Sequence, residues 1–148
     1  HQGLREYQAP VEYGRSEIIR KGKKIAVQGV GSMIPSCMEI CKGLKDDGYD
    51  PTFVNARFVK PLDVDLLDEL AKDHSLFVTV EENVKSGGYG EHVSAYMEAC
   101  HPEIRVLSAA VWDRFVPQGN VESLRSRIGL GVEDIRQAIE DSEELREQ

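Results

Sequence analysis

The sequence predicts an α/β fold: a three-layer α/β/α domain whose five-stranded sheet is mostly parallel, with an antiparallel element at its edge. The first observation is that short apolar runs alternate with stretches whose apolar residues recur at helical spacing. The second is that most of these runs are apolar on both faces, which is typical of parallel strands covered by helices on both sides. The third is a length of 148 residues, about one domain with a sizeable core.

The first elements predicted are two short strands at residues 16–20 (SEIIR) and 24–28 (KIAVQ). A Lys-Gly-Lys turn separates them, and this pattern favours a hairpin. Glycines then lead into a helix that starts near residue 34, with a proline tolerated in its first turn. Its predicted apolar face is Ile34, Cys37, Met38, Cys41 and Leu44.

The middle of the chain continues the alternation of strands and helices. Residues 52–59 and 75–80 have the β-branched and aromatic composition of strands. A helix between them opens at Pro61 and Asp63, and another follows the glycine-rich turn at residues 86–90. Their predicted buried faces are Val64, Leu67, Leu70 and Ala71, and Val93, Tyr96, Met97 and Cys100.

The last predicted strand is residues 104–111, and a short helix from Asn120 to about Gly129 precedes the final helix. The final helix has Val132, Ile135, Ala138 and Ile139 on its apolar face. We expect a lead-in at 1–15, one domain at 16–141 and an acidic tail at 142–148 that frays.

Composition excludes several classes of function. The 26 acidic and 18 basic residues give a net charge of −8, which disfavours nucleic-acid binding. No run of 18 apolar residues and no signal-peptide core is present, so we expect a cytoplasmic protein. Because the chain begins with His1 rather than Met, we expect it to be a piece of a longer protein.

A glycine turn after the second predicted strand is the first candidate site. Gly29, Gly31 and Ser32 would let the chain turn sharply and leave helix N–H groups free for an anion. A dinucleotide fingerprint would need a third glycine where Ile34 stands. A plain turn and an anion site both remain open.

Two adjacent carboxylates at a strand end form the second candidate. Glu81 and Glu82 would point to opposite faces of the strand, so they are a poor acid/base pair. One of them could cap backbone N–H groups while the other pairs with a neighbouring domain. The third candidate is Arg57, a guanidinium in an apolar strand, which needs either an internal carboxylate or a contact with another domain.

No other pattern predicts chemistry. The four histidines are scattered without metal-ligand spacing. Cys37, Cys41 and Cys100 form no CxxC pair, and helical spacing predicts core packing for all three. No nucleophile, base and orienting group come together in the sequence.

Four segments in order, QGVGSM, VNARFVKPLD, VTVEENVKSGGYGEHV and DRFVPQGN, carry a resemblance that covers nearly the whole chain. They resemble the C-terminal domain of the 1-deoxy-D-xylulose-5-phosphate synthases, in the transketolase-like thiamine-diphosphate enzyme family. The segment from Trp112 to Gly119 departs from the pattern expected there, which puts in doubt any contact made by that loop.

The resemblance implies a parent transferase that condenses decarboxylated pyruvate with glyceraldehyde 3-phosphate for isoprenoid, thiamine and pyridoxal precursors, as a homodimer. Thiamine diphosphate and Mg²⁺ would belong to its N-terminal and middle domains, so we expect no catalytic, cofactor-binding or metal residue here and no activity of the fragment alone. The expected role is packing against those domains. The candidate interdomain contacts are Arg57, Glu81, Glu82, Gly87, Gly88 and Gly90.

Two alternatives remain open at this stage. One is the matching domain of a 2-oxoacid dehydrogenase beta chain, whose partner would be an acyltransferase core. The other is a stand-alone regulatory domain that binds an anion at the Gly29–Ser32 turn.

Overall fold

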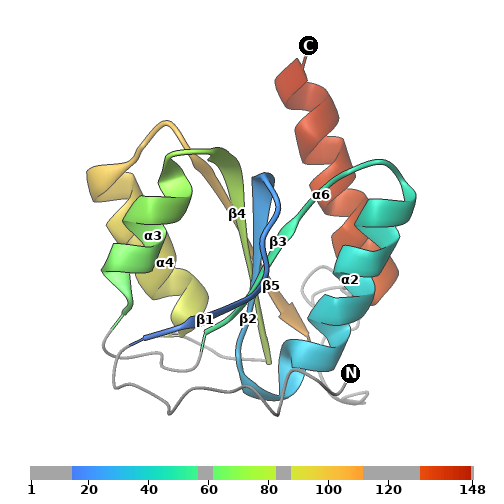
Figure 1. The fold of residues 1–148 in the computed structure, drawn as a ribbon, viewed down its shortest axis with the longest axis horizontal. Helices are drawn as coiled ribbons and strands as arrows, with labels where there is room; N and C mark the ends of the chain where they lie inside the picture. The colour runs from blue at the N-terminus through green and yellow to red at the C-terminus, as the bar shows by residue number, and fades with distance from the viewer. Residues whose placement is uncertain (1–14, 57–61, 83–87, 112–130, 148) are drawn as a thin grey trace, which may run out of the picture.

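The chain forms a five-stranded sheet with helices on both faces (Figure 1). The computed structural model describes residues 15–56, 62–82, 88–111 and 131–147. The strands are Glu17–Arg20 (β1), Lys24–Gly29 (β2), Thr52–Asn55 (β3), His74–Glu82 (β4) and Arg105–Val111 (β5). The helices are the 3₁₀ turn Gly31–Met33 (η1), Ile34–Asp46 (α2), Val64–Ala71 (α3), Tyr89–Cys100 (α4) and Val132–Glu147 (α6). The predicted fold class is confirmed.

The strand order β1-β3-β2-β4-β5 corrects one prediction. β2, β3, β4 and β5 are parallel, and β1 pairs antiparallel with β3 rather than with β2, so the predicted hairpin is wrong. The turn at Gly22 packs against the backbone of Asp50 and Pro51, and the Lys23 N–H donates to the Asp50 carbonyl at 2.7 Å. The connection therefore passes over the start of β3, which leaves the more exposed β1 at the edge.

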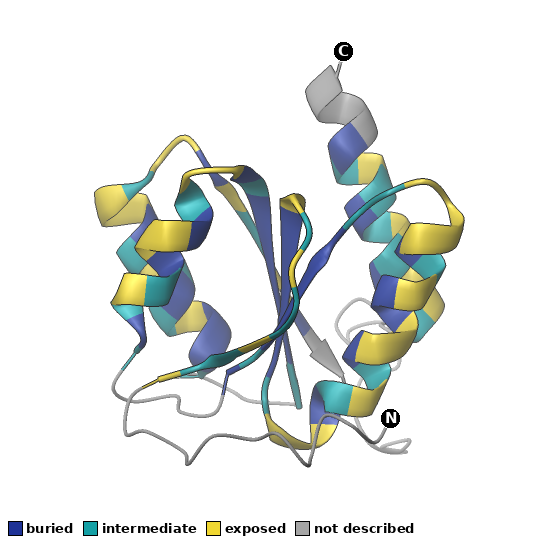
Figure 2. Ribbon diagram, in the orientation of Figure 1, coloured by how far each residue is buried: buried dark blue, intermediate teal, exposed yellow. Residues whose placement is uncertain are grey.

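Two apolar cores lie on the two faces of the sheet. Figure 2 shows buried residues along the strands and on the inner sides of the helices. One core packs α2 and α6 against the sheet, around Ile25, Val27, Leu44 and Ile135. The other packs α3 and α4 against the opposite face, around Phe77, Leu67, Val93 and Met97. Each strand of the interior is thus buried on both sides, as its apolar sequence requires.

The buried face of α2 differs from the predicted one by one residue. Met38 is 53% exposed, whereas Ile40 is fully buried, so the prediction for Met38 is wrong. Positions 37, 40, 41 and 44 form one helical face, and position 38 lies to its side. Burial raises the pKa of both the Cys37 and the Cys41 thiol to about 12, as expected of core cysteines.

The third cysteine is not a core residue. Val93 and Met97 of α4 are buried as predicted, but Cys100 is exposed and the prediction of core packing for it is wrong. Tyr89, Val93 and Met97 recur every four residues and face the sheet. Cys100 has the spacing of the same face, but it is the last residue of the helix and is exposed there.

Helix α6 is joined to the end of α2 by one arginine. The Arg136 guanidinium contacts Asp47 and also bonds Glu133 and Glu140, and hydrogen bonding to Glu133 raises its pKa. The acidic end of the chain, where fraying was expected, is helical through Glu147, and Glu143 is buried. The predicted short helix at 120–129 lies outside the described residues.

Among the described residues, no helix is both long enough and apolar enough to span a bilayer.

Candidate functional site

The carboxyl ends of the parallel strands bring together most of the candidate residues that the structure describes. Connections from neighbouring strands leave this edge on opposite faces: α2 follows β2 on one face, and α4 follows β4 on the other (Figure 1). Between β2 and β4 the strand order therefore reverses, which is where open α/β sheets bind ligands. A hydrogen bond of 3.1 Å from the Val30 N–H to the Val80 carbonyl extends the pairing at this point. We call this place, between the ends of β2 and β4 and beside the start of α4, the switch-point crevice.

Glu81, at the end of β4, bonds to the start of α4. Its Oε1 accepts from the Tyr89 N–H at 2.8 Å and its Oε2 from the Gly90 N–H at 2.9 Å. The N-cap residue itself is Gly88, which has no side chain to offer the first-turn N–H groups. Glu81 thus caps α4 from the preceding strand, and its charge also complements the positive end of the helix dipole.

Glu82 projects from the other face of the strand and is only partly buried. Within the described part of the chain, its carboxylate makes no hydrogen bond or ion pair. The two adjacent carboxylates therefore have different environments: that of Glu81 is bonded to the start of α4, whereas that of Glu82 makes no bond to another described residue.

Gly90 lies against a row of polar side chains on the sheet. Gln28, Thr79 and Ser108 are paired across β2, β4 and β5 on the face that α4 covers. A Cβ at Gly90 would lie 2.7 Å from Thr79 Oγ1, 2.8 Å from Glu81 Oε2 and 2.9 Å from Ser108 Oγ. Only glycine fits there, so the structure places this candidate contact residue inside the domain.

Tyr89 fills the space between the ends of β2 and α4. Its side chain is buried, and its hydroxyl donates to Gln28 Oε1 at 2.6 Å. Burial, together with the nearby carboxylates of Asp63 and Glu81, raises the pKa of the Tyr89 phenol. The phenol therefore stays neutral.

The glycine turn after β2 forms the 3₁₀ turn η1, which no side chain caps. Gly31 has φ +56°, a left-handed conformation that favours glycine. Gly29 lies so close to α2 that a Cβ would be 2.6 Å from Cys37 Sγ. The glycines at 29 and 31 are thus explained by the turn and the packing, and the anion site at Gly31 and Ser32 stays a prediction. Arg57 and Gly87 lie outside the described residues.

Asp63, the N-cap of α3, bonds the chain just before β1 to the first turn of α3. Its Oδ1 accepts from the Leu66 N–H at 3.2 Å and its Oδ2 from the Ser16 N–H at 2.7 Å. A hollow of about 460 Å³ lies beside it between β1 and α3, with Ile18 and Glu69 also in its wall. One carboxylate thus joins the first described residues to α3.

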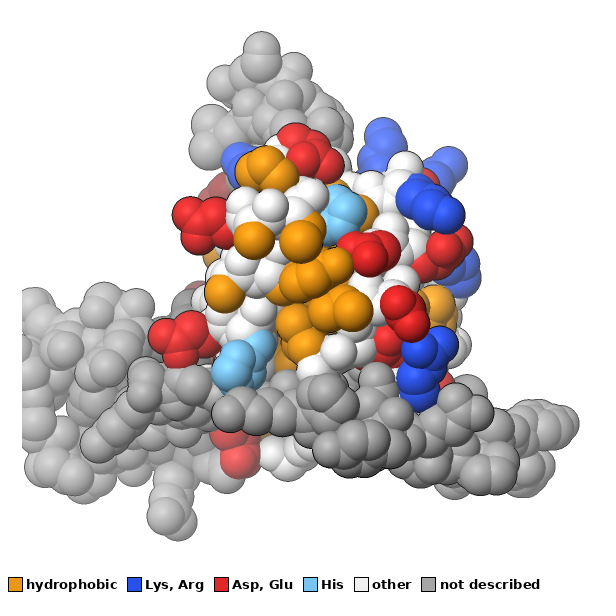
Figure 3. All heavy atoms as spheres, turned by 90° about the vertical axis from the view of Figure 1, so that its left-hand side faces the viewer, with side chains coloured by type: hydrophobic (Ala, Val, Ile, Leu, Met, Phe, Trp, Pro, Cys, Tyr) orange, Lys and Arg blue, Asp and Glu red, His pale blue; other side chains and the backbone are white. Residues whose placement is uncertain are grey.

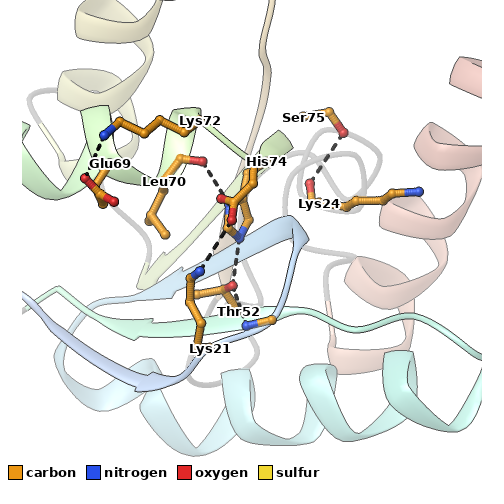
Figure 4. A network of polar contacts seen from close by, with 10 residues as sticks. Lys21, Lys24, Thr52, Glu69, Leu70, Lys72, His74 and Ser75 are labelled. Atoms are coloured by element: carbon orange, nitrogen blue, oxygen red, sulfur yellow. Dashed lines mark hydrogen bonds and ion pairs between the residues drawn. The ribbon is translucent and has the colours of Figure 1, made fainter.

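A buried histidine network at the opposite end of the sheet was missed by the sequence analysis (Figure 4). Thr52 Oγ1 accepts from the Gly22 N–H at 2.8 Å and faces His74 Nε2 at 2.7 Å. His74 Nδ1 in turn faces the Leu70 carbonyl at 2.8 Å and Asp73 Oδ1 at 2.7 Å. Nδ1 thus faces two acceptors and therefore carries a proton, which leaves Nε2 of a singly protonated ring to accept from the Thr52 hydroxyl.

The order hydroxyl, imidazole and carboxylate resembles a nucleophile with its base, but both Thr52 and His74 are buried. No substrate can reach a hydroxyl that is fully enclosed, so the network holds the turn before β2, β3 and β4 together. The only sequence signal was a histidine at a strand start, next to an aspartate.

The outer face of α3 and α4 carries a smaller polar cluster. Asp68 Oδ1 accepts from the Tyr96 hydroxyl at 2.8 Å and faces His101 Nε2 at 2.7 Å. Hydrogen bonds from His101 and Tyr96 lower the pKa of the Asp68 carboxyl. Figure 3 shows hydrophobic side chains gathered on this face with acidic ones around them, and the partly buried residues that pack here include Leu66 and Ala71.

Comparison with known proteins identifies the family to which this sequence belongs. The family described as "Transketolase, C-terminal domain" matches residues 14–135. A 1-deoxy-D-xylulose-5-phosphate synthase of Lachnoclostridium phytofermentans is 39% identical over 134 residues, which is 90% of this chain and 21% of that protein. The enzyme of the same name from Dictyoglomus thermophilum is 39% identical over 137 residues, 93% of this chain and 22% of that protein. This chain thus spans about a fifth of the length of the curated relatives it matches.

Solved structures agree with the fold. A split-gene transketolase, in the form of an inactive beta4 tetramer, has a TM-score of 0.75 and 28% identity and covers 90% of this chain and 43% of that one. A 2-oxoglutarate:ferredoxin oxidoreductase from Magnetococcus marinus has a TM-score of 0.54 and 12% identity, covers 94% of this chain and 20% of that one, and shows the fold alone.

The fold is therefore that of a three-layer α/β domain, and at the carboxyl edge of its sheet Asp63, Glu81 and Tyr89 are bonded within the domain. The chain belongs to the transketolase C-terminal domain family. The predicted resemblance to 1-deoxy-D-xylulose-5-phosphate synthases is confirmed by relatives of that name that are 33–39% identical over most of the chain.

Proposed function

We propose that this chain is the C-terminal domain of a thiamine-diphosphate-dependent 1-deoxy-D-xylulose-5-phosphate synthase and serves to pack against the catalytic domains. One observation carries the proposal: relatives with that name match about nine-tenths of this chain but only about a fifth of their own length. The full protein would condense decarboxylated pyruvate with glyceraldehyde 3-phosphate, in the cytoplasm and as a homodimer, and this domain would supply no reacting group.

In this proposal the domain does not hold thiamine diphosphate or its metal. No group of three or more His, Cys, Asp or Glu side chains that could hold a metal ion occurs in the described ranges. Diphosphates often bind at helix N-termini, and at α3 and α4 such N–H groups are already bonded by Asp63 and Glu81, whereas the starts of η1 and α2 have no side-chain cap. In this proposal the cofactor and Mg²⁺ are held by the remaining four-fifths of the parent enzyme.

The contact with the catalytic domains is proposed at the carboxyl end of the sheet. Glu82 is the described carboxylate there that has no bond within the described part of the chain, and Gly88, the N-cap of α4, lies at the same end of the sheet. Arg57 and Gly87, which lie outside the described residues, stay in the proposed contact as candidates from the sequence alone. Glu81 and Gly90 support this edge from within, through the bonds and the close packing at the start of α4.

A domain exchange tests the proposal. This chain replaces the matching segment of the Lachnoclostridium phytofermentans relative, and formation of 1-deoxyxylulose 5-phosphate is followed with both substrates, thiamine diphosphate and Mg²⁺. We expect the hybrid to be active, the relative without this segment to be inactive or unfolded, and this chain alone to be inactive. Turnover by the chain alone would refute the proposal, as would an inactive hybrid that folds and assembles as the relative does.

A charge reversal tests the contact within the hybrid. Glu82→Lys should weaken assembly and lower activity, whereas Glu98→Lys, the same change at an exposed position of α4, should leave both unchanged. Equal effects of the two substitutions would contradict a contact at Glu82.

A further inference from the structure

The switch-point crevice has the general form of a ligand site. The helix that follows β4 directs its N-terminus toward this edge, and N–H groups at such a place favour an anion. The N-terminus of α3 opens on the same face of the sheet. A ligand suited to this crevice would carry a carboxylate or phosphate at the helix start and an organic group against the end of β2.

In this chain, the Glu81 side chain occupies the anion position and the Tyr89 side chain occupies the position against the end of β2. The Glu81 carboxylate accepts from the Tyr89 and Gly90 N–H groups at 2.8 and 2.9 Å, as a bound anion would. The Tyr89 ring is 2% exposed and its hydroxyl lies 2.6 Å from Gln28 Oε1, as the polar end of a bound aromatic compound would.

The wall of the crevice also holds more hydrogen-bonding groups than its present occupants use. Gln28 and Thr79 are fully buried, yet Gln28 Nε2 and Thr79 Oγ1 have no partner within the described part of the chain. Buried polar atoms are nearly always bonded, so these two atoms need partners that the described residues do not supply. This second observation is independent of the helix N-terminus, and a bound polar group at this place would supply such a partner.

We propose that the switch-point crevice is a binding site for a carboxylate and a phenol that the chain fills with its own Glu81 and Tyr89. It follows that free phosphate does not bind there in the intact chain, and that removing either side chain opens a site for a free molecule with the same groups. The proposal concerns this chain alone and does not depend on the activity proposed for its parent.

The carboxylate half is tested with acetate, which supplies the atoms that Glu81→Ala removes. Glu82→Ala is the matched control, since it removes the neighbouring carboxylate without freeing an N–H group. In Glu81→Ala, amide exchange at Tyr89 and Gly90 should accelerate at least tenfold, and sodium acetate should slow it again while sodium chloride at equal ionic strength does not. No difference between acetate and chloride, or an equal response of the control, would overturn this half.

The phenol half is tested with Tyr89→Ala. Millimolar phenol should raise the melting temperature of this variant more than that of the unmodified chain, and more than benzene does, because benzene has no hydroxyl to donate to Gln28. Adding Gln28→Leu should abolish the preference for phenol over benzene.

Equal stabilisation of the variant and the unmodified chain would overturn the phenol half, as would a preference that survives Gln28→Leu. A Tyr89→Ala chain that stays unfolded in phenol also counts against it. Tyr89→Phe, which keeps the ring, should fold and gain nothing from phenol. Inorganic phosphate titrated into the unmodified chain should leave the Tyr89 and Gly90 amide signals unshifted, and a saturable shift would refute the internal occupation.

Discussion

Gly90→Ala is the substitution that most directly tests the packing of α4 on the sheet. The added methyl group would lie 2.7 to 2.9 Å from three oxygen atoms, those of Thr79, Glu81 and Ser108. Real Cβ atoms do not approach oxygen so closely, and two of the oxygens belong to short side chains on β4 and β5 that have little room to move. The helix start must therefore move away from the sheet, or the Glu81 carboxylate must leave its two N–H partners.

The expected loss follows from three contributions. Alanine is favoured over glycine in a helix by up to about 1 kcal/mol, which acts in favour of the variant. Forcing one methyl group into a packed site costs about 1–3 kcal/mol. Weakening the charge-assisted hydrogen bonds of Glu81 costs a further 1.5–3 kcal/mol or so if the carboxylate is displaced. We expect a net loss of about 2 kcal/mol, which lowers the melting temperature by roughly 4–8 °C for a domain of this size.

Urea unfolding followed by circular dichroism measures this loss, and Gly43→Ala is the control. A Cβ at Gly43 would lie 2.5 Å from Cδ of Arg136, so the clash is with one long side chain whose carboxylate partners include the exposed Asp47 and Glu133. Because exposed ion pairs contribute little and helix propensity favours alanine, Gly43→Ala should lose clearly less free energy than Gly90→Ala. The reasoning fails if Gly90→Ala is as stable as the unmodified chain, or if both variants lose the same free energy.

Three further substitutions and one labelling experiment test the remaining contacts. Asp63→Ala removes the cap of α3 and the partner of the first strand, and should lower the free energy of unfolding by about 1–2 kcal/mol in urea. Thr52→Val should cost about 1–3 kcal/mol, because the buried histidine loses its partner; a neutral result would contradict the network. The hydrogen bond to His101 lowers the pKa of Asp68 in the folded chain. The ionised carboxylate therefore stabilises the fold at a pH above its unfolded-state pKa of about 4, and this stabilisation is lost as the pH falls through the lower pKa of the folded chain. The difference in melting temperature between the unmodified chain and Asp68→Asn should therefore vanish in acid. Cys100 should react with a thiol reagent in the native protein, and the two buried thiols only after unfolding.

The fold could be predicted from the sequence because its signals are local and repeated. Short apolar runs that alternate with stretches of helical spacing predicted the sheet, its helices and the order of these elements along the chain. Strand order is not a local property, so the short connection between β1 and β2 suggested a hairpin although β3 lies between them. The face of α2 was wrong at Met38 for a related reason: several apolar residues in one turn leave the exact direction of the buried stripe undetermined, and packing against the sheet selects Ile40.

The candidate site was predictable only in part. Alternation along a strand correctly indicated opposite directions for Glu81 and Glu82, and capping by one of them was among the alternatives. Which carboxylate caps depends on where α4 starts in space, since the bonded N–H groups lie eight and nine residues further on. The close approach at Gly90 and the 22-residue separation of Thr52 and His74 are likewise products of the tertiary fold.

The polar groups at the two ends of the sheet are bonded in different ways. At the amino end, the network of Thr52 and His74 joins three segments and is fully enclosed. At the carboxyl end, where domains of this architecture usually bind ligands, Asp63, Glu81 and Tyr89 use their polar groups on the domain's own backbone and on Gln28. Because these groups are bonded inside the domain, they are not free to act on a substrate, which agrees with the proposal that this domain supplies no reacting group. The exchange experiment decides the proposed packing role: we expect activity in the hybrid and none in this chain alone.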